Sequence, residues 1–310
     1  MVLLRTAHLP SLAAAAAFGL IAFLFRSLRW AVMIRSYAPK APLADIYGST
    51  LLGFAAVLVM GRPAELLRPF LIGRQIGSPF ISQVGALFLE RIYDLLAVLA
   101  LGAWALSTAD LQHIASDSAL AVALRTGGGI VALAAAGATA LLLVFTFASS
   151  FAIGRLRDAL GFLPEEKQAS ANRLVESFGN SVSVSRNPLR FAQISGYTFV
   201  HWVTVGVSSW FVFAAFPESA NIGMPDIYRF LALLALASAI PLPGLATAFF
   251  VVSSLLLTEW LRLPFETASA VTLGIWCAQL GITVPFGSLA ALRMGLNWRK
   301  IKHMEQEAQL

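Results

Sequence analysis

Charge and cysteine are both scarce in this sequence. Asp, Glu, Lys and Arg make up 12% of its 310 residues, roughly half the charged fraction of an ordinary soluble domain, and this excludes a water-soluble fold. Cys277 is the only cysteine, so an intramolecular disulfide is excluded and we expect this side chain to serve packing. The four histidines are too scattered for a metal site, and no cofactor is predicted: His8, His113, His201 and His303.

Motifs of soluble enzymes are missing as well. The sequence holds neither HExxH nor GxSxG, and the glycine run at 127–129 lacks the lysine and hydroxyl residue of a phosphate-binding loop. The formal net charge of +6 favours anionic lipid headgroups as partners. Nucleic acid is a poor alternative, because no basic soluble domain exists to bind it.

Long apolar runs dominate what is present. A helix of about twenty apolar residues spans a hydrocarbon core of about 30 Å. The sequence thus predicts an all-α integral membrane protein, a polytopic helical bundle that forms a single membrane domain over residues 1–310. Within it, the polar stretch 154–189 is expected to be an amphipathic connection on the membrane surface. Hydropathy gives eight apolar segments, at about 10–34, 45–60, 79–106, 128–153, 190–216, 226–240, 245–258 and 267–292.

Lysine and arginine in the connections predict the orientation, because short cytoplasmic loops are enriched in them. The connections at 107–118 and 217–226 contain acids but neither lysine nor arginine, so they should face outward. We expect a multi-pass protein of the cytoplasmic (inner) membrane, with 154–189 and the C-terminus in the cytoplasm. The basic residues on that side are Arg155, Arg157, Lys167, Arg173, Arg186, Arg190, Arg293, Arg299, Lys300 and Lys302.

Two basic loops lie on either side of the short segment 45–60. If this segment spans the membrane, one of the two loops lies outside. Alternatively, the chain enters the membrane, turns around 61–65 and returns as a re-entrant hairpin, which places both loops inside. The first loop is predicted around Arg26, Arg29, Arg35 and Lys40, and the second around Arg62, Arg68 and Arg74.

A second re-entrant hairpin is suggested around 241–244, where the short segments 226–240 and 245–258 meet. Proline removes a backbone donor, so a break here leaves backbone groups that lipid cannot satisfy. Paired short segments interrupted by proline and glycine indicate a midplane substrate site in transporters. A pair of simple kinks is the alternative. The residues of the break are Pro241, Leu242, Pro243 and Gly244.

Arg62, Glu65 and Arg68 recur at every third position of "GRPAELLRP". Pro63 suits the first turn of a helix, and Pro69 disfavours a helical Arg68. The three charges then share one side of a short helix, with a carboxylate between two guanidinium groups. Because arginine presents a planar fork of donors to phosphate oxygens, Arg62 and Arg68 are candidate phosphate ligands. Glu65 is expected to hold these arginines, or Arg91, in place.

The second charged cluster, Glu90, Arg91 and Asp94 in "ERIYD", lies within an apolar segment. If that helix enters the membrane near Pro79, Glu90 lies about 16 Å along it, close to the midplane. Each charge at the centre of a helix costs roughly 2.5–3.5 kcal/mol on insertion scales, so the three should be paired or wet. Glu90 is the candidate titrating group, and Asp94 is expected to hold Arg62, Arg68 or Arg91 in place. Interhelical salt bridges that serve assembly are the alternative.

These residues together resemble a known family, the flippase-like membrane domain of lysylphosphatidylglycerol synthases and its stand-alone relatives. In order and spacing the resemblance covers most of the chain, without the soluble synthase domain. The motifs that carry it are "LRW" (Leu28, Arg29, Trp30), R-x-x-E-x-x-R (Arg62, Glu65, Arg68), E-R-x-x-D (Glu90, Arg91, Asp94) and P-x-P-G (Pro241, Pro243, Gly244).

The resemblance implies a helical fold with re-entrant elements that moves a lipid headgroup between leaflets. We therefore expect translocation of an anionic phospholipid or lipid-linked glycan, a transporter-like activity rather than an enzymatic one. The charged motifs and the 241–244 break would form its site. The alternatives are a membrane-embedded lipid-modifying transferase and a non-catalytic partner of a glycosyltransferase or lipid synthase. Membrane lipids are the expected partners, beside self-association or contact with a lipid-synthesis enzyme.

Overall fold

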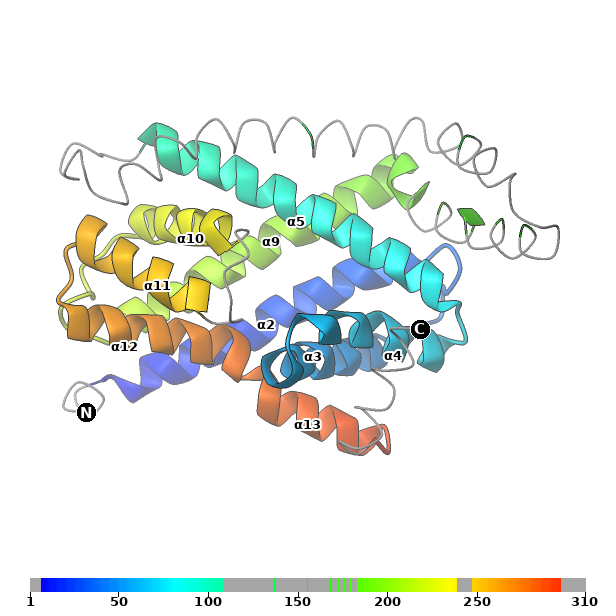
Figure 1. Ribbon diagram of the computed structural model, residues 1–310, viewed down its shortest axis with the longest axis horizontal. Coiled ribbons are helices and arrows are strands. Elements are labelled where there is room, and N and C mark those ends of the chain that lie inside the picture. Colours follow the sequence, from blue (N-terminus) through cyan, green and yellow to red (C-terminus); the bar gives the residue numbers. More distant parts are fainter. Residues whose placement is uncertain are drawn as a thin grey trace. The chain divides into compact units, whose positions relative to one another are not determined.

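The computed structural model describes residues 7–108, 183–238 and 247–296, together with single helical positions between 137 and 179 (Figure 1). Every regular element in these residues is a helix, which confirms the all-α prediction. The α-helices are α2 (Leu9–Ile34), α3 (Leu43–Met60), α4 (Leu67–Ile76), α5 (Phe80–Thr108), α9 (Pro188–Phe213), α10 (Met224–Ser238), α11 (Thr247–Leu255), α12 (Phe265–Trp276) and α13 (Thr283–Arg293). Shorter segments are the 3₁₀-helices η1 (Arg62–Leu66) and η2 (Ser183–Arg186) and the π-helices η3 (Leu256–Trp260) and η4 (Cys277–Gly281).

Three helical stretches of the described chain are long and apolar enough to cross a membrane: Leu9–Ile34, Leu43–Met60 and Phe265–Arg293. They support the predicted membrane protein. Apart from single positions, the predicted apolar segment 128–153 lies outside the described residues, and so does most of the polar connection 154–189.

The loop predicted around Arg26 and Arg29 is not formed, because α2 runs on to Ile34. Hydropathy treats an arginine as an interruption, whereas arginine is a good helix former. Arg26 is 9% exposed and Arg29 is fully buried. Buried charges require counter-charges from neighbouring helices, and α5 supplies them, as the site shows.

The described helices group into two compact units, each assembled from distant parts of the chain. α2, α5 and α9 are long enough to contribute residues to both units. Unit 1 comprises Met1–Ala22, Leu95–Gly137 and His201–Ile282, and unit 2 comprises Phe23–Asp94, Ala138–Val200 and Thr283–Leu310.

In unit 2, α3 and α4 form a helical hairpin and lie side by side in Figure 1. The chain turns at Gly61, whose φ of 93° favours glycine, and continues through η1. α4 has 10 residues, about 15 Å of helix, which is too short to cross a core of about 30 Å. Ser49 Oγ in α3 donates to Gln75 Oε1 near the end of α4, at 3.2 Å. The hairpin predicted around 61–65 is therefore present, with its two ends together.

The connections that lead into and out of this hairpin also meet. Tyr37 Oη, from the connection after α2, donates to the backbone carbonyl of Ser82 in the first turn of α5, at 3.2 Å. A chain that returns to the point where it entered favours the re-entrant arrangement over a membrane span followed by an outer loop.

Pro69 does not keep Arg68 out of the helix, contrary to the prediction. α4 begins at Leu67 and continues through Pro69. A proline in the first turn of a helix removes an amide that has no partner within that helix, so it costs little there. Arg68 is consequently held on a regular helix rather than on a loop.

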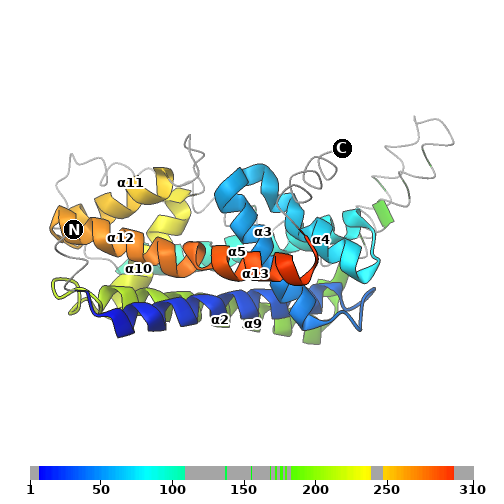
Figure 2. The same ribbon diagram turned by 90° about the horizontal axis from the view of Figure 1, so that it is seen from below.

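Small residues let α13 pack closely on α3 in unit 2, as Figure 2 shows. A Cβ atom at Gly287 of α13 would lie 2.8 Å from the carbonyl oxygen of Leu51 and 3.0 Å from Ala55 Cβ. One at Gly48 of α3 would lie 3.0 Å from the Met294 side chain. Such glycine contacts are typical of helices packed within membranes.

Unit 1 has its own apolar core, which includes the edge-on ring pair Phe213 and Phe230. α10 and α11 pack against each other, and the buried hydroxyls of Ser253 in α11 and Thr272 in α12 lie 2.7 Å apart. The break predicted at Pro241, Pro243 and Gly244 lies outside the described residues, which leave out 239–246. The second hairpin stays a prediction.

Candidate functional site: a buried charge network beside a small recess

Five charged side chains from three helices form one buried network in unit 2. Arg26 Nη2 and Arg29 Nη1 lie 2.8 Å and 2.6 Å from the two carboxylate oxygens of Asp94. Glu90 Oε1 lies 3.3 Å from Arg26 Nε and 2.9 Å from Arg29 Nη2. Arg68 Nη2 donates to Glu90 Oε2, and Arg68 Nη1 lies 3.4 Å from Glu90 Oε1. Arg26 and Arg29 come from α2, Arg68 from α4, and Glu90 and Asp94 from α5.

Helical spacing places these charges opposite one another. Arg26 and Arg29 are three residues apart on α2, and Glu90 and Asp94 are four apart on α5, so each pair occupies one helix face. Thr198 of α9 accepts a further hydrogen bond from Arg29 Nη1 at 2.9 Å. All five charged side chains are at most 12% exposed, so each charge depends on its partners rather than on water.

The network carries more positive than negative charge. Three guanidinium groups face two carboxylates, which leaves a formal surplus of one positive charge. Arg26 and Arg29 each contact both Glu90 and Asp94, so these four residues balance without help. Of the two acids in the network, Arg68 contacts only Glu90. Arg68 is therefore the cation that carries the surplus charge.

Arg68 is enclosed by aromatic rings, and one of its nitrogen atoms, Nε, makes no hydrogen bond with the described residues. Its Cζ atom lies 3.9 Å from the ring centroid of Trp30 and 5.8 Å from that of Phe54. The residue is 3% exposed, yet its Nε has no hydrogen-bond partner among the described residues. A buried donor without a partner is costly, so Arg68 Nε marks a place where an acceptor would be stabilising.

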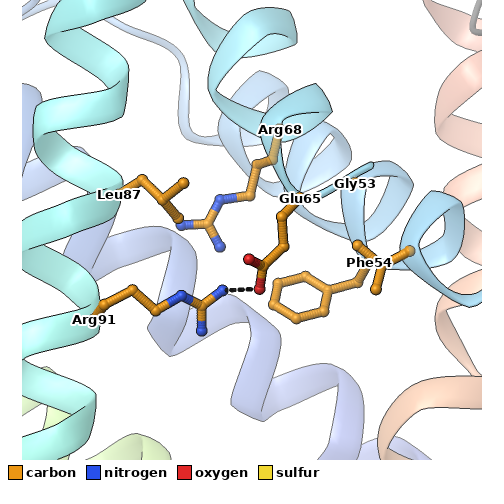
Figure 3. A pocket seen from close by; sticks show the side chains of 7 residues that line it. Gly53, Phe54, Glu65, Arg68, Leu87 and Arg91 are labelled. Carbon is orange, nitrogen blue, oxygen red and sulfur yellow. Dashed lines mark hydrogen bonds and ion pairs between the residues drawn. The ribbon is translucent and has the colours of Figure 1, made fainter. Parts of the chain in front are cut away.

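A second ion pair lies nearer the surface. Arg91 Nη2 of α5 lies 2.7 Å from Glu65 Oε1 of η1, and the two side chains are 41% and 45% exposed. Between this pair and Arg68 lies a small recess, shown in Figure 3. Its volume of about 10 Å³ is on the scale that holds one water molecule. The recess is lined by Gly53, Phe54, Val57, Glu65, Arg68, Leu87 and Arg91.

The structure sorts the predicted site residues into two groups rather than one. Glu65 pairs with Arg91, one of the partners predicted for it, whereas Asp94 holds Arg26 and Arg29, neither of which was predicted as its partner. Arg68 borders both groups, since it contacts Glu90 and also lines the recess. Those whose side chains lie outside the described residues are Arg62, Pro241, Pro243 and Gly244.

Arg26 and Arg29 are the members of the network to which sequence reasoning gave no role. Both were predicted to lie in the first basic loop, and Arg29 also belongs to the "LRW" motif of the resemblance. Their spacing could have indicated a role. Two arginines three residues apart share one face of a helix, as two acids four residues apart do, and two such faces of opposite charge can pair. Among the described residues no group of three or more His, Cys, Asp or Glu is placed to hold a metal ion.

Comparison with known protein families identifies the family of the chain. The family model described as lysylphosphatidylglycerol synthase TM region matches residues 1–287. The chain belongs to this family. Membership in the lysylphosphatidylglycerol synthase TM region family, together with the apolar helices, makes it a multi-pass membrane protein with a lipid-related function. No curated protein and no solved structure matches the chain.

Proposed function

We propose that this member of the lysylphosphatidylglycerol synthase TM region family translocates lipids with an anionic headgroup, a phospholipid or a lipid-linked glycan, between leaflets. The observation that carries the proposal is the surplus charge of Arg68 beside the recess. A guanidinium group is suited to phosphate oxygens. Glu90 occupies the Arg68 donors that a phosphate would take.

The balance of charges in the network lowers the free-energy cost of moving Arg68 from Glu90 to a phosphate. When Arg68 leaves Glu90 for a phosphate, Glu90 still contacts Arg26 and Arg29. No carboxylate is left buried without a counter-charge, which would otherwise cost several kcal/mol. The unused Nε of Arg68 gains an acceptor at the same time.

The hairpin carries the polar groups of the proposed site, and a change in its contacts could widen the recess. Two short segments that follow the glycine turn bring the charges into the unit: η1 carries Glu65 and α4 carries Arg68. A phosphate group is larger than the present recess of about 10 Å³, so the proposal requires an open form. Separation of Glu65 from Arg91, the more exposed pair, would widen the recess with little loss of stability.

The test is lipid exchange in reconstituted vesicles with Arg68→Gln. This change leaves two arginines against two acids, so the protein should fold. Loss of a charge-assisted hydrogen bond of about 1.5–3 kcal/mol predicts a roughly ten- to hundredfold slower exchange of fluorescent phosphatidylglycerol.

Arg229→Gln is the matched control, because Arg229 also pairs with an acid, Asp226, at 2.7 Å, in unit 1. Its exchange rate should stay near the wild-type rate. Normal exchange in folded Arg68→Gln protein would remove Arg68 from the mechanism and the proposal with it.

A further inference from the structure

Trp30 covers one face of the Arg68 guanidinium, at 3.9 Å from its ring centroid to Cζ. Guanidinium donors point outward in the plane of the group, along its edges, whereas an aromatic ring binds its face. Contact with Trp30 therefore uses none of the hydrogen-bond donors of Arg68. Glu90 and an incoming phosphate compete for the edges, and neither competes with Trp30.

Trp30 is itself held by a chain of polar contacts. Its Nε1 donates to Gln83 Oε1 at 3.1 Å, and Gln83 Nε2 donates to Ser78 Oγ at 3.2 Å. Trp30 and Gln83 are both fully buried. A Cβ at Gly73 would lie 3.3 Å from Gln83 Cγ, so α4 and α5 also fit closely at this point. The ring consequently has a fixed position.

We propose that Trp30, fixed by Gln83, is a positioning residue that keeps Arg68 in place while its donors change from Glu90 to the phosphate of a lipid headgroup. This inference rests on the proposed function. Without Trp30 the freed guanidinium has no fixed partner and loses its orientation toward the recess. Trp30 acts through Arg68 and makes no contact of its own with substrate.

Three variants separate the parts of this arrangement. Trp30→Phe keeps an aromatic face but loses the N–H, Trp30→Leu loses both, and Gln83→Met leaves the indole N–H without its acceptor. Trp276→Leu is the control for truncating an indole, because Trp276 packs against Phe250 in unit 1. Exchange is measured against the mole fraction of fluorescent phosphatidylglycerol in phosphatidylcholine vesicles.

The mole fraction that gives half the maximal rate should rise about tenfold in Trp30→Leu, and about threefold in Trp30→Phe and Gln83→Met, because a misplaced donor weakens binding of charged groups. Trp276→Leu should leave it unchanged. A fall in maximal rate alone, with the same half-saturation in all three variants, would overturn the positioning role, and an equal rise in Trp276→Leu would do so as well.

A double-mutant cycle tests the contact separately from transport. Unfolding of Trp30→Phe, Arg68→Gln and the double variant is followed in detergent, with Gln83→Met replacing Trp30→Phe if that variant does not fold. We expect the losses in the free energy of unfolding to be non-additive, because both substitutions weaken the same contact, the one between Trp30 and Arg68. Additive effects would overturn the inference. If the wild-type protein moves no lipid, the proposed function fails, whereas the cycle still decides whether Trp30 positions Arg68.

Discussion

Glu90 and Glu65 both contact arginine side chains, but the two acids differ in burial, so losing their charge should affect stability differently. The Glu90 side chain is fully buried among Arg26, Arg29 and Arg68. The Glu65 and Arg91 side chains are nearly half exposed. Water can replace a partner for the exposed pair and cannot do so for the buried one.

Replacing each acid by its amide should therefore separate the two pairs. Glu90→Gln leaves three buried guanidinium groups with one carboxylate, and we expect a loss of about 3–5 kcal/mol in the free energy of unfolding. Glu65→Gln should change it by less than about 1 kcal/mol. Unfolding in detergent micelles measures both. Equal losses in the two variants would contradict the buried network.

The acids of the network were predictable from the sequence, and their partners were not. Glu90 and Asp94 lie in an apolar segment, where only pairing or hydration makes a charge tolerable. The arginine partners of Asp94 are 65 and 68 positions away, and Glu90 contacts the same two arginines as well as Arg68. Local spacing indicates which residues share a helix face, but it does not reveal which two faces meet.

Among the elements, the α3–α4 hairpin shows how a glycine permits a functional side chain to approach. A Cβ at Gly53 of α3 would lie 2.7 Å from Arg68 Cβ and 3.3 Å from its Cα. These are atoms close to the backbone of α4, so they cannot move without shifting the helix. Gly53 thus fixes how near α3 comes to Arg68.

Gly53→Ala should push α4 away and disturb the contacts of Arg68 with Trp30 and Glu90. Overpacking of this kind costs about 1–3 kcal/mol, and we expect lipid exchange to slow together with the loss in stability. Gly196→Ala is the matched control, because a Cβ at Gly196 in α9 meets nothing within 4 Å. It should stabilise the protein by about 0.5–1 kcal/mol, as alanine does within a helix. If Gly53→Ala instead stabilised the protein, α3 and α4 would have to lie farther apart than the 2.7 Å approach to Arg68 Cβ implies.

The hairpin was predictable as an element because segment 45–60 is short and basic loops lie on both sides of it. Its internal details were not predictable. Pro69 alone disfavours a helical Arg68, but in the first turn of α4 its missing N–H interrupts no intrahelical hydrogen bond, so the helix continues through it. Arg26 and Arg29 in turn stay helical because α5 supplies their counter-charges.

For the whole molecule, the hairpin removes the conflict between loop charge and orientation. Tyr37 contacts Ser82, and Ser49 contacts Gln75, so the connections before α3 and after α4 lie together. The exposed basic residues that flank the hairpin, Arg35, Lys40 and Arg74, can then all face the cytoplasm, as the excess of lysine and arginine predicts. The acid-bearing connection around Ala220, which contains neither lysine nor arginine, is still predicted to face outward.

Single cysteines placed in a Cys277→Ser background would test this topology. Pro39→Cys and Gln75→Cys lie before and after the hairpin and leave the number of charges unchanged, so the excess of positive charge that sets orientation is preserved. Pro39, Gln75 and Ala220 are all exposed. In sealed right-side-out vesicles, a membrane-impermeant thiol reagent should label Ala220→Cys, whereas the other two should react only after the membrane is opened.

Whether Pro39→Cys and Gln75→Cys are labelled from the same side of the membrane decides whether the hairpin is re-entrant. This comparison does not depend on which side is the cytoplasm. If α3 crossed the membrane completely, Pro39→Cys and Gln75→Cys would react from opposite sides, and the charged residues of η1 and α4 would lie in an outer loop. Reaction from the same side requires the chain to enter and leave through one face, with Glu65 and Arg68 inside the bilayer. Their charges must then be paired or hydrated there, which is the condition under which Arg68 can exchange Glu90 for a lipid phosphate.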